Sequence, residues 1–153
     1  MRYNPLDEPY ARIVSRFLDL CVHFLVTCAF ALLIYLRFER IDYVIFAIFG
    51  GVFIDSDHFL DYLIHTKHFS LKEFLVTPYG ESKKAYILFH SWELVFILLI
   101  AGLVFDLSQV VILSVGMVLH LLIDTLQRKS FLLYCLSYRI INKFDVSFLK
   151  LDL

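Results

Sequence analysis

The stretch "FGGVFIDSDHFLDYLIHTKH", residues 49–68, decides how this chain is interpreted. It begins as an apolar run of the kind found in membrane helices. It then places five ionisable side chains within eleven residues: Asp55, Asp57, His58, Asp61 and His65. Ionisable groups are costly in a membrane segment and usually mark a functional site there. The rest of the chain must therefore either shield these groups or use them.

The composition indicates a membrane protein. Hydrophobic residues make up 60% of the 153 residues and charged residues 19%, whereas a soluble domain is about half apolar and a quarter charged. The mean hydropathy is +0.76. We expect a single membrane domain over residues 1–153. The net charge of -1 predicts no nucleic-acid partner.

Four apolar segments predict an all-α, integral membrane four-helix bundle. A helix of about 20 residues crosses a bilayer, and only internal backbone pairing is tolerated in hydrocarbon. The predicted spans are residues 18–36, 41–60, 85–105 and 108–126. Gly50 and Gly51 in the second span should allow a close approach between helices.

The two ends of the chain lie outside these spans. The aromatic, aliphatic and basic tail, residues 130–150, is predicted to form an amphipathic helix in the membrane interface. The first twenty residues are too polar for a signal peptide, so we expect none.

The distribution of Lys and Arg predicts the orientation. The arm before the first span has three, the connection between the second and third spans has four, and the tail has five. The opposite side has only Arg37 and Arg40. Because positive residues collect in the cytoplasm, we expect both termini there. The protein is then expected in a bacterial or archaeal cytoplasmic (inner) membrane.

This orientation brings the polar residues of all four spans to one face. The first span carries Asp19 and His23 near its cytoplasmic end, and the second span ends with the acidic stretch quoted above. The third span begins with His90 and Glu93, and the fourth ends with His120 and Asp124. The charge count did not use these residues, so their agreement with it favours a shared site at the cytoplasmic interface.

The spacing and chemistry of these residues favour metal binding. Residues three or four apart share a helix face, and a mixture of His nitrogen and carboxylate oxygen suits zinc, with manganese or iron as alternatives. The candidate ligands exceed what one ion needs, so one or two ions are expected. They are His23, Asp55, His58, His90, His120 and Asp124.

Several side chains keep alternative roles at this stage. Asp57 and Glu93 are the candidate catalytic groups, as a general base or as holders of a water molecule. Asp57 alternatively faces solvent, and Asp61 alternatively pairs with His65. His23 alternatively bonds to the helix backbone as a core histidine.

The order of these motifs resembles that of the YdjM-like membrane-bound metal-dependent hydrolases. The matching stretches are "LCVHFLV" (His23), "FIDSDHFLD" (Asp55, Asp57, His58), "LFHSWEL" (His90) and "VLHLLIDTL" (His120, Asp124). Three positions depart from the family pattern: Ile54 replaces a proline, and Leu88 with Phe89 replaces an Arg-Gly pair. The family is distantly similar to zinc-dependent phospholipase C and single-strand nucleases. The resemblance implies an all-helical metallohydrolase acting on phosphoester-type substrates.

Two functions from different classes follow. The first is a membrane-embedded hydrolase that cleaves a phosphoester-type or lipid substrate, because a lipid can reach a site at this depth without leaving the bilayer. The expected partners are the bilayer and a lipid or phosphorylated small molecule. The alternative is a non-catalytic metal-binding membrane protein, either a metal or proton transporter or a scaffold. The sequence specifies no oligomeric state.

Overall fold

The computed structural model describes residues 9–76 and 84–149, and within these ranges it is helical. No strand is formed in the described residues apart from an isolated bridge between Lys84 and Asp145. Three helical stretches are long and apolar enough to cross a membrane: Ile13–Phe38, Ile41–Thr66 and Ser108–Arg128. The prediction of an all-α chain is therefore confirmed for the described residues, and these three helices make it a candidate membrane protein. The first eight and last four residues, which include the end of the predicted tail, lie outside the described part.

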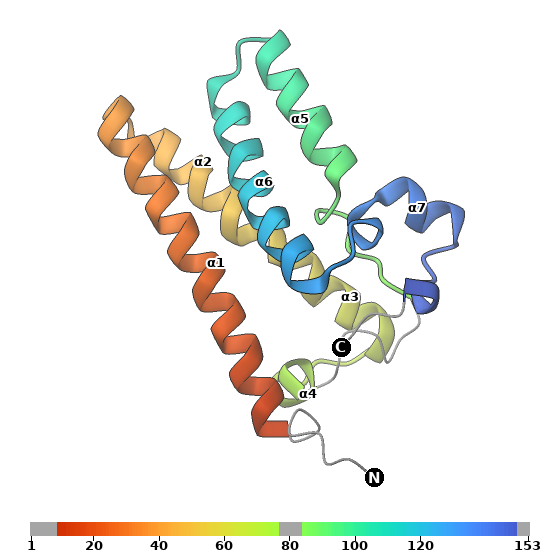
Figure 1. Cartoon of the computed structure of the whole chain (residues 1–153). Coiled ribbons are helices and arrows are strands. Elements are labelled where there is room, and N and C mark those ends of the chain that lie inside the picture. The colour runs from red at the N-terminus through yellow and green to blue at the C-terminus, as the bar shows by residue number, and fades with distance from the viewer. Residues whose placement is uncertain (1–8, 77–83, 150–153) are drawn as a thin grey trace.

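The first half of the chain is a long helical hairpin (Figure 1). Helix α1 (Pro9–Phe38) is followed after Glu39 and Arg40 by α2 (Ile41–Val52), the 3-10 turn η2 (Phe53–Asp55) and α3 (Ser56–Thr66). The second predicted span, 41–60, thus extends to Thr66. The 3-10 turn falls at the acidic stretch and changes the direction in which its side chains leave the helix axis.

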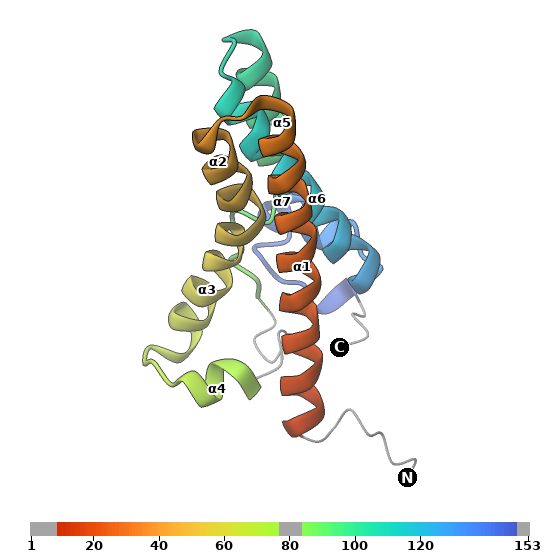
Figure 2. The same ribbon diagram turned by 90° about the vertical axis from the view of Figure 1, so that its left-hand side faces the viewer.

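The second half adds another hairpin. Helices α5 (Trp92–Val104) and α6 (Ser108–Arg128) pack against each other, and α6 also packs along α2, which in turn packs on α1 (Figures 1 and 2). The short helix α4 (Leu71–Val76) contacts α1. Helix α6 is therefore central, with neighbours from both hairpins.

Glycines bring α2 close to its two neighbours, as predicted for Gly50 and Gly51. A Cβ on Gly50 would lie 2.2 Å from the carbonyl oxygen of Leu113 in α6, and a Cβ on Gly51 would lie 2.2 Å from Oγ1 of Thr27 in α1. Gly116 faces α2 in the same way, 2.9 Å from the carbonyl oxygen of Ala47. Small residues thus allow the backbones themselves to meet.

The third predicted span is wrong in its first part, because the helix begins at Trp92 and not at residue 85. Ser91 has extended backbone angles and its side chain accepts a hydrogen bond from the Leu94 amide, as an N-cap does. Residues 85–91 run as a non-helical segment whose backbone groups are bound by side chains of other elements. Its apolar residues gave the segment the composition of a helix, but those tertiary bonds replace the helical ones.

The tail also differs from its prediction. Instead of one amphipathic helix over residues 130–150, it forms the short elements η3 (Leu132–Tyr134), α7 (Leu136–Ile141) and η4 (Ser147–Leu149). Leu133, Tyr134 and Val146 are buried in one cluster with Ile87 and Trp92. The tail therefore packs over the non-helical segment and the start of α5. These three tail side chains are covered by protein, whereas other apolar side chains of the tail are exposed: Phe131, Leu132, Ile140 and Ile141.

Candidate metal centre

Four side-chain atoms from three parts of the chain converge next to the 3-10 turn. They are Oδ1 of Asp55 from η2, Nε2 of His90 from the non-helical segment, and Nε2 of His120 with Oδ2 of Asp124 from α6. His120 and Asp124 share a face of α6 because they lie four residues apart. Asp124 also approaches His23 of α1 on its other side, so α1 contributes as well.

Five distances among these four atoms match the edges of a tetrahedral zinc site, and Asp55, His90 and His120 form one group whose donor atoms are close enough to hold an ion. Nε2 of His90 lies 3.2 Å from Nε2 of His120, 3.5 Å from Asp55 and 3.4 Å from Asp124. Nε2 of His120 lies 3.4 Å from Asp55 and 3.5 Å from Asp124. A tetrahedral zinc ion with bonds of about 2.0–2.1 Å needs ligand-to-ligand distances of about 3.3–3.4 Å. The donor set, two imidazoles and two carboxylates, also suits zinc.

The hydrogen bonds of the imidazole rings point their free nitrogens into this site. Nδ1 of His90 donates to Oδ1 of Asp57 at 2.8 Å, and Nδ1 of His120 donates to the carbonyl oxygen of Gly51 at 2.9 Å. Nδ1 of His23 donates to the carbonyl oxygen of Asp19 at 2.9 Å. These partners are acceptors, so each Nδ1 carries a proton, and in its neutral form each ring presents an Nε2 lone pair. Fixing the tautomer in this way is typical of metal-ligating histidines.

Asp57 orients His90 through three hydrogen bonds. Besides the imidazole, its carboxylate accepts the backbone amides of Phe89 at 2.7 Å and of His90 at 3.1 Å. The side chain is 2% exposed. The sequence analysis assigned Asp57 a catalytic role; the structure engages both of its oxygens with the His90 segment. This arrangement is that of a carboxylate that supports a ligand from behind.

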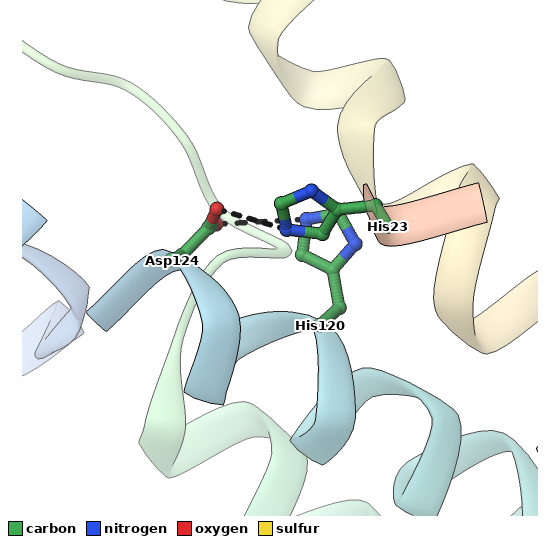
Figure 3. Close-up of side chains that lie close together, drawn as sticks. All are labelled: His23, His120 and Asp124. Carbon is green, nitrogen blue, oxygen red and sulfur yellow. Dashed lines mark ion pairs between the residues drawn. The ribbon is translucent and has the colours of Figure 1, made fainter. Parts of the chain in front are cut away.

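His23 and the second oxygen of Asp124 extend the site toward α1. Nε2 of His23 lies 3.1 Å from Oδ1 of Asp124, and its ring centroid lies 4.1 Å from that of His120 (Figure 3). Nε2 of His23 has no hydrogen-bond partner of suitable geometry despite this distance. His23, His120 and Asp124 form one group whose donor atoms are close enough to hold an ion. Asp124 thus presents one oxygen to each side.

His58 lies on the opposite side of His90. Its ring centroid is 4.4 Å from that of His90, and it forms a third group of metal-ligating type with Asp57 and His90. Seven residues of the three groups are therefore contiguous, since His90 and His120 each belong to two groups: His23, Asp55, Asp57, His58, His90, His120 and Asp124. All six sequence-predicted metal ligands are among them.

Glu93 lies outside these groups. Its carboxylate accepts the backbone amides of Leu136 at 2.8 Å and Ser137 at 2.9 Å, and the Ser137 hydroxyl at 2.7 Å. It therefore caps the first turn of α7, whereas the sequence analysis gave it a catalytic role. Its position three residues after His90 in the predicted third span put it with the ligands, but the helix itself begins at Trp92, one residue before Glu93.

Two further ionisable residues of the quoted stretch, Asp61 and His65, have structural partners. Oδ1 of Asp61 accepts the Tyr86 amide at 2.7 Å, which fixes the beginning of the non-helical segment. His65 donates to the carbonyl oxygen of Asp61 and approaches its carboxylate at 3.6 Å. The expected pairing of Asp61 with His65 is thus present. Asp19 approaches Nδ1 of His23 at 3.6 Å from the preceding turn of α1.

The site has one accessible ligand. His90 and His120 are almost completely buried and the Asp124 side chain is 10% exposed, whereas that of Asp55 is 31% exposed. Access from outside is therefore through Asp55, at the junction of η2 and α3. Sequence reasoning missed one supporting group, Arg139, which is fully buried beside His90. An arginine inside the apolar run "YCLSYRII" was the available signal.

Comparison of the chain with protein-family models, curated proteins and solved structures finds no match. The chemistry of the site therefore carries the functional interpretation.

Proposed function

We propose that this protein is a membrane-embedded, metal-dependent hydrolase that binds zinc, as one or two ions, and cleaves a phosphoester-type or lipid substrate. The observation that carries the proposal is the contiguous set of seven histidine and aspartate residues around Nε2 atoms that are spaced for an ion. One tetrahedral ion needs four ligands, so this set exceeds a structural requirement. The resemblance to YdjM-like hydrolases points in the same direction.

The proposal includes a bundle of four membrane helices with both termini in the cytoplasm. Helix α5 has only thirteen residues, fewer than the roughly 20 that cross a bilayer alone. The segment before it supplies the missing length. Non-helical backbone is tolerated at membrane depth where protein covers it, and here Ile87, His90 and Ser91 are buried. The distribution of Lys and Arg supports the orientation.

This topology places the metal centre below the cytoplasmic interface. Asp55 follows Ile41 by fourteen residues, or about 21 Å at the helical rise of about 1.5 Å per residue. With the Glu39–Arg40 connection at the outer surface of a hydrocarbon layer about 30 Å thick, Asp55 lies about 9 Å inside the opposite boundary. The bond that joins a lipid headgroup to its backbone reaches this depth more easily than a water-soluble molecule does.

The residues of the site divide the chemical work. Asp55, His90, His120 and Asp124 would hold a divalent ion, which would polarise a phosphoryl or carbonyl oxygen and lower the pKa of a bound water to about 7. Asp57 and the Gly51 carbonyl hold the two central imidazoles in the tautomer that binds an ion. Asp55, as the exposed ligand, borders the place where a substrate enters. The side chains that surround His90 and His120 exclude bulk water, which strengthens every charge interaction there.

A non-catalytic metal-binding protein is the second candidate, and one observation favours it. The four central atoms are all supplied by protein, and closed four-ligand zinc sites are usually structural. The two functions differ in whether a water molecule or substrate has access to the ion. The exposure of Asp55 and the additional donors of His23 and His58 favour the hydrolase.

The test combines metal content with turnover. Protein purified in detergent is analysed for bound transition metal, and phosphate-containing lipids in mixed micelles are followed for release of headgroup or diacylglycerol. We expect bound zinc, lipid cleavage, and loss of both in Asp55→Ala and His120→Ala. Asp106→Asn, an exposed residue at the far end of α5, is the control and should change neither. Bound zinc without cleavage of any lipid or phosphoester would favour the non-catalytic candidate, and absence of metal would exclude both.

A further inference from the structure

The segment that carries His90 lies between two opposite charges. On one side, Asp57 takes the N–H groups of Phe89 and His90. On the other, the guanidinium of Arg139 donates from Nη1 to the carbonyl oxygen of Ile87 and from Nη2 to that of His90 at 2.8 Å. The carboxylate thus binds donors of this backbone and the guanidinium binds its acceptors. Asp57 and Arg139 together fix the backbone that carries His90.

Arg139 is buried completely, at 0% exposure. A charged side chain that leaves water costs several kcal/mol unless partners compensate. Burial lowers the pKa of the Arg139 guanidinium, and the nearby carboxylates of Asp57 and Glu93 act in the opposite direction. A tail that only covered apolar surface would have no need of this group. Its two carbonyl contacts both fall on the segment that supplies a central metal ligand.

A second contact joins the tail to this part of the chain, and here the side chain lies near His90 and the backbone groups belong to the tail. Glu93, three residues after His90, accepts the amides of Leu136 and Ser137 at the start of α7, the helix that carries Arg139. Beyond α7, the carbonyl oxygen of Phe144 accepts the Ala85 amide at 3.0 Å. The tail therefore contacts the His90 segment at Ala85, again at Ile87 and His90, and just beyond the segment at Glu93.

We propose that Arg139 is a positioning residue of the metal centre, and that the tail acts through it to hold His90 at the ion. This inference rests on the metal centre of the proposed function, but it needs no hydrolytic activity. Loss of a partner behind a ligand typically lowers metal affinity about 10- to 100-fold. Arg139 acts on the ligand's backbone and not on its ring, so we expect the lower end, about tenfold.

The experiment measures Co²⁺ binding to the full chain in detergent, since the visible spectrum of Co²⁺ reports the ligands and their geometry. We expect Arg139→Met to bind Co²⁺ about tenfold more weakly, with an altered spectrum. Arg139→Lys should recover part of the affinity, because an ammonium can still donate to one of the two carbonyls. Arg37→Met removes an exposed arginine in the last turn of α1. It is the matched control and should bind Co²⁺ as the wild type does.

A second measurement separates positioning from general stability. Hydrogen exchange of the metal-free protein should accelerate at residues 85–91 in Arg139→Met, with α1 and α6 unchanged. If Arg139→Met does not fold, Glu93→Gln loosens the reverse contact and should weaken Co²⁺ binding in the same direction. A folded Arg139→Met protein with wild-type affinity and spectrum would overturn this inference alone. Wild-type protein that binds no Co²⁺ would overturn the metal centre and this inference with it.

Discussion

The substitution Asp57→Asn tests the orientation of His90 with almost no change in shape. The Asp57 carboxylate accepts three hydrogen bonds, two on Oδ2 and one on Oδ1. An asparagine has a single oxygen, so its NH₂ group must face either the two backbone amides or Nδ1 of His90. Facing two buried donors with a third would cost about 1–3 kcal/mol. The amide oxygen is therefore expected to take the two backbone amides.

The NH₂ group then faces Nδ1 of His90 and stabilises the tautomer with its proton on Nε2. This places an N–H group where the metal-binding lone pair lies in the wild type. Restoring the lone pair requires the imidazole to lose a hydrogen bond and to meet an opposing donor. The expected loss of metal affinity is about 10- to 100-fold, or about 1.4–2.7 kcal/mol.

Competition of the purified protein with a chromophoric zinc chelator measures this affinity. Asp61→Asn is the matched control, because it is the same change one turn further along α3. Asp61 accepts a backbone amide from Tyr86 on one oxygen, and an asparagine oxygen can keep that bond. We expect zinc affinity within about threefold of wild type in this control, a change below about 0.7 kcal/mol. Equal zinc affinity in Asp57→Asn and wild type would refute the tautomer argument.

Three further outcomes are expected. Gly50→Ala should lower the unfolding temperature in detergent by an amount equivalent to about 1–3 kcal/mol, because its Cβ would overlap the Leu113 carbonyl oxygen. The control Cys28→Ala, at an exposed position of α1, should leave the unfolding temperature unchanged. Equal unfolding temperatures of the two variants would contradict the close packing of α2 on α6. Zinc at 100 times its dissociation constant should stabilise the wild type by about 2.7 kcal/mol relative to metal-free protein, with no effect on His120→Ala; a zinc response preserved in His120→Ala would place the ion elsewhere. Green fluorescent protein fused after Leu153 should fluoresce in cells, whereas a periplasmic reporter inserted at Glu39–Arg40 should be active there, and the reverse pattern would invert the proposed orientation.

The helical period and the distribution of Lys and Arg were sufficient to predict that the ligands lie close together. His120 and Asp124 share a helix face at any tilt of α6, and the Lys and Arg count predicts that the polar ends of the spans lie on one side. Gly50 and Gly51 predicted the close contact of α2 with its neighbours. These features depend on the helical repeat and on the contrast between lipid and water, and both leave a direct pattern in the sequence.

The supporting groups could not be predicted in the same way, because they depend on one non-helical segment. "AYILFHS" has the composition of a membrane helix, and nothing local reveals that Asp57, Asp61 and Arg139 bind its backbone. Ser91 was the one local signal, as an N-cap residue before Trp92. Once the helix starts at Trp92, Glu93 lies in its first turn and faces the tail. The assignment of Glu93 as a catalytic group followed from an unbroken third span, and that of Asp57 from its place in the acidic stretch that ends the second span.

The most direct test of the metal centre is X-ray absorption spectroscopy of the zinc-loaded protein at the zinc edge. The account predicts nitrogen and oxygen ligands at about 2.0–2.1 Å, with the outer-shell scattering of two imidazoles from His90 and His120. His120→Ala, which lacks one of the two imidazoles, should retain no zinc under the same conditions. A protein that retains no zinc, or a zinc spectrum without imidazole scattering, would contradict the account.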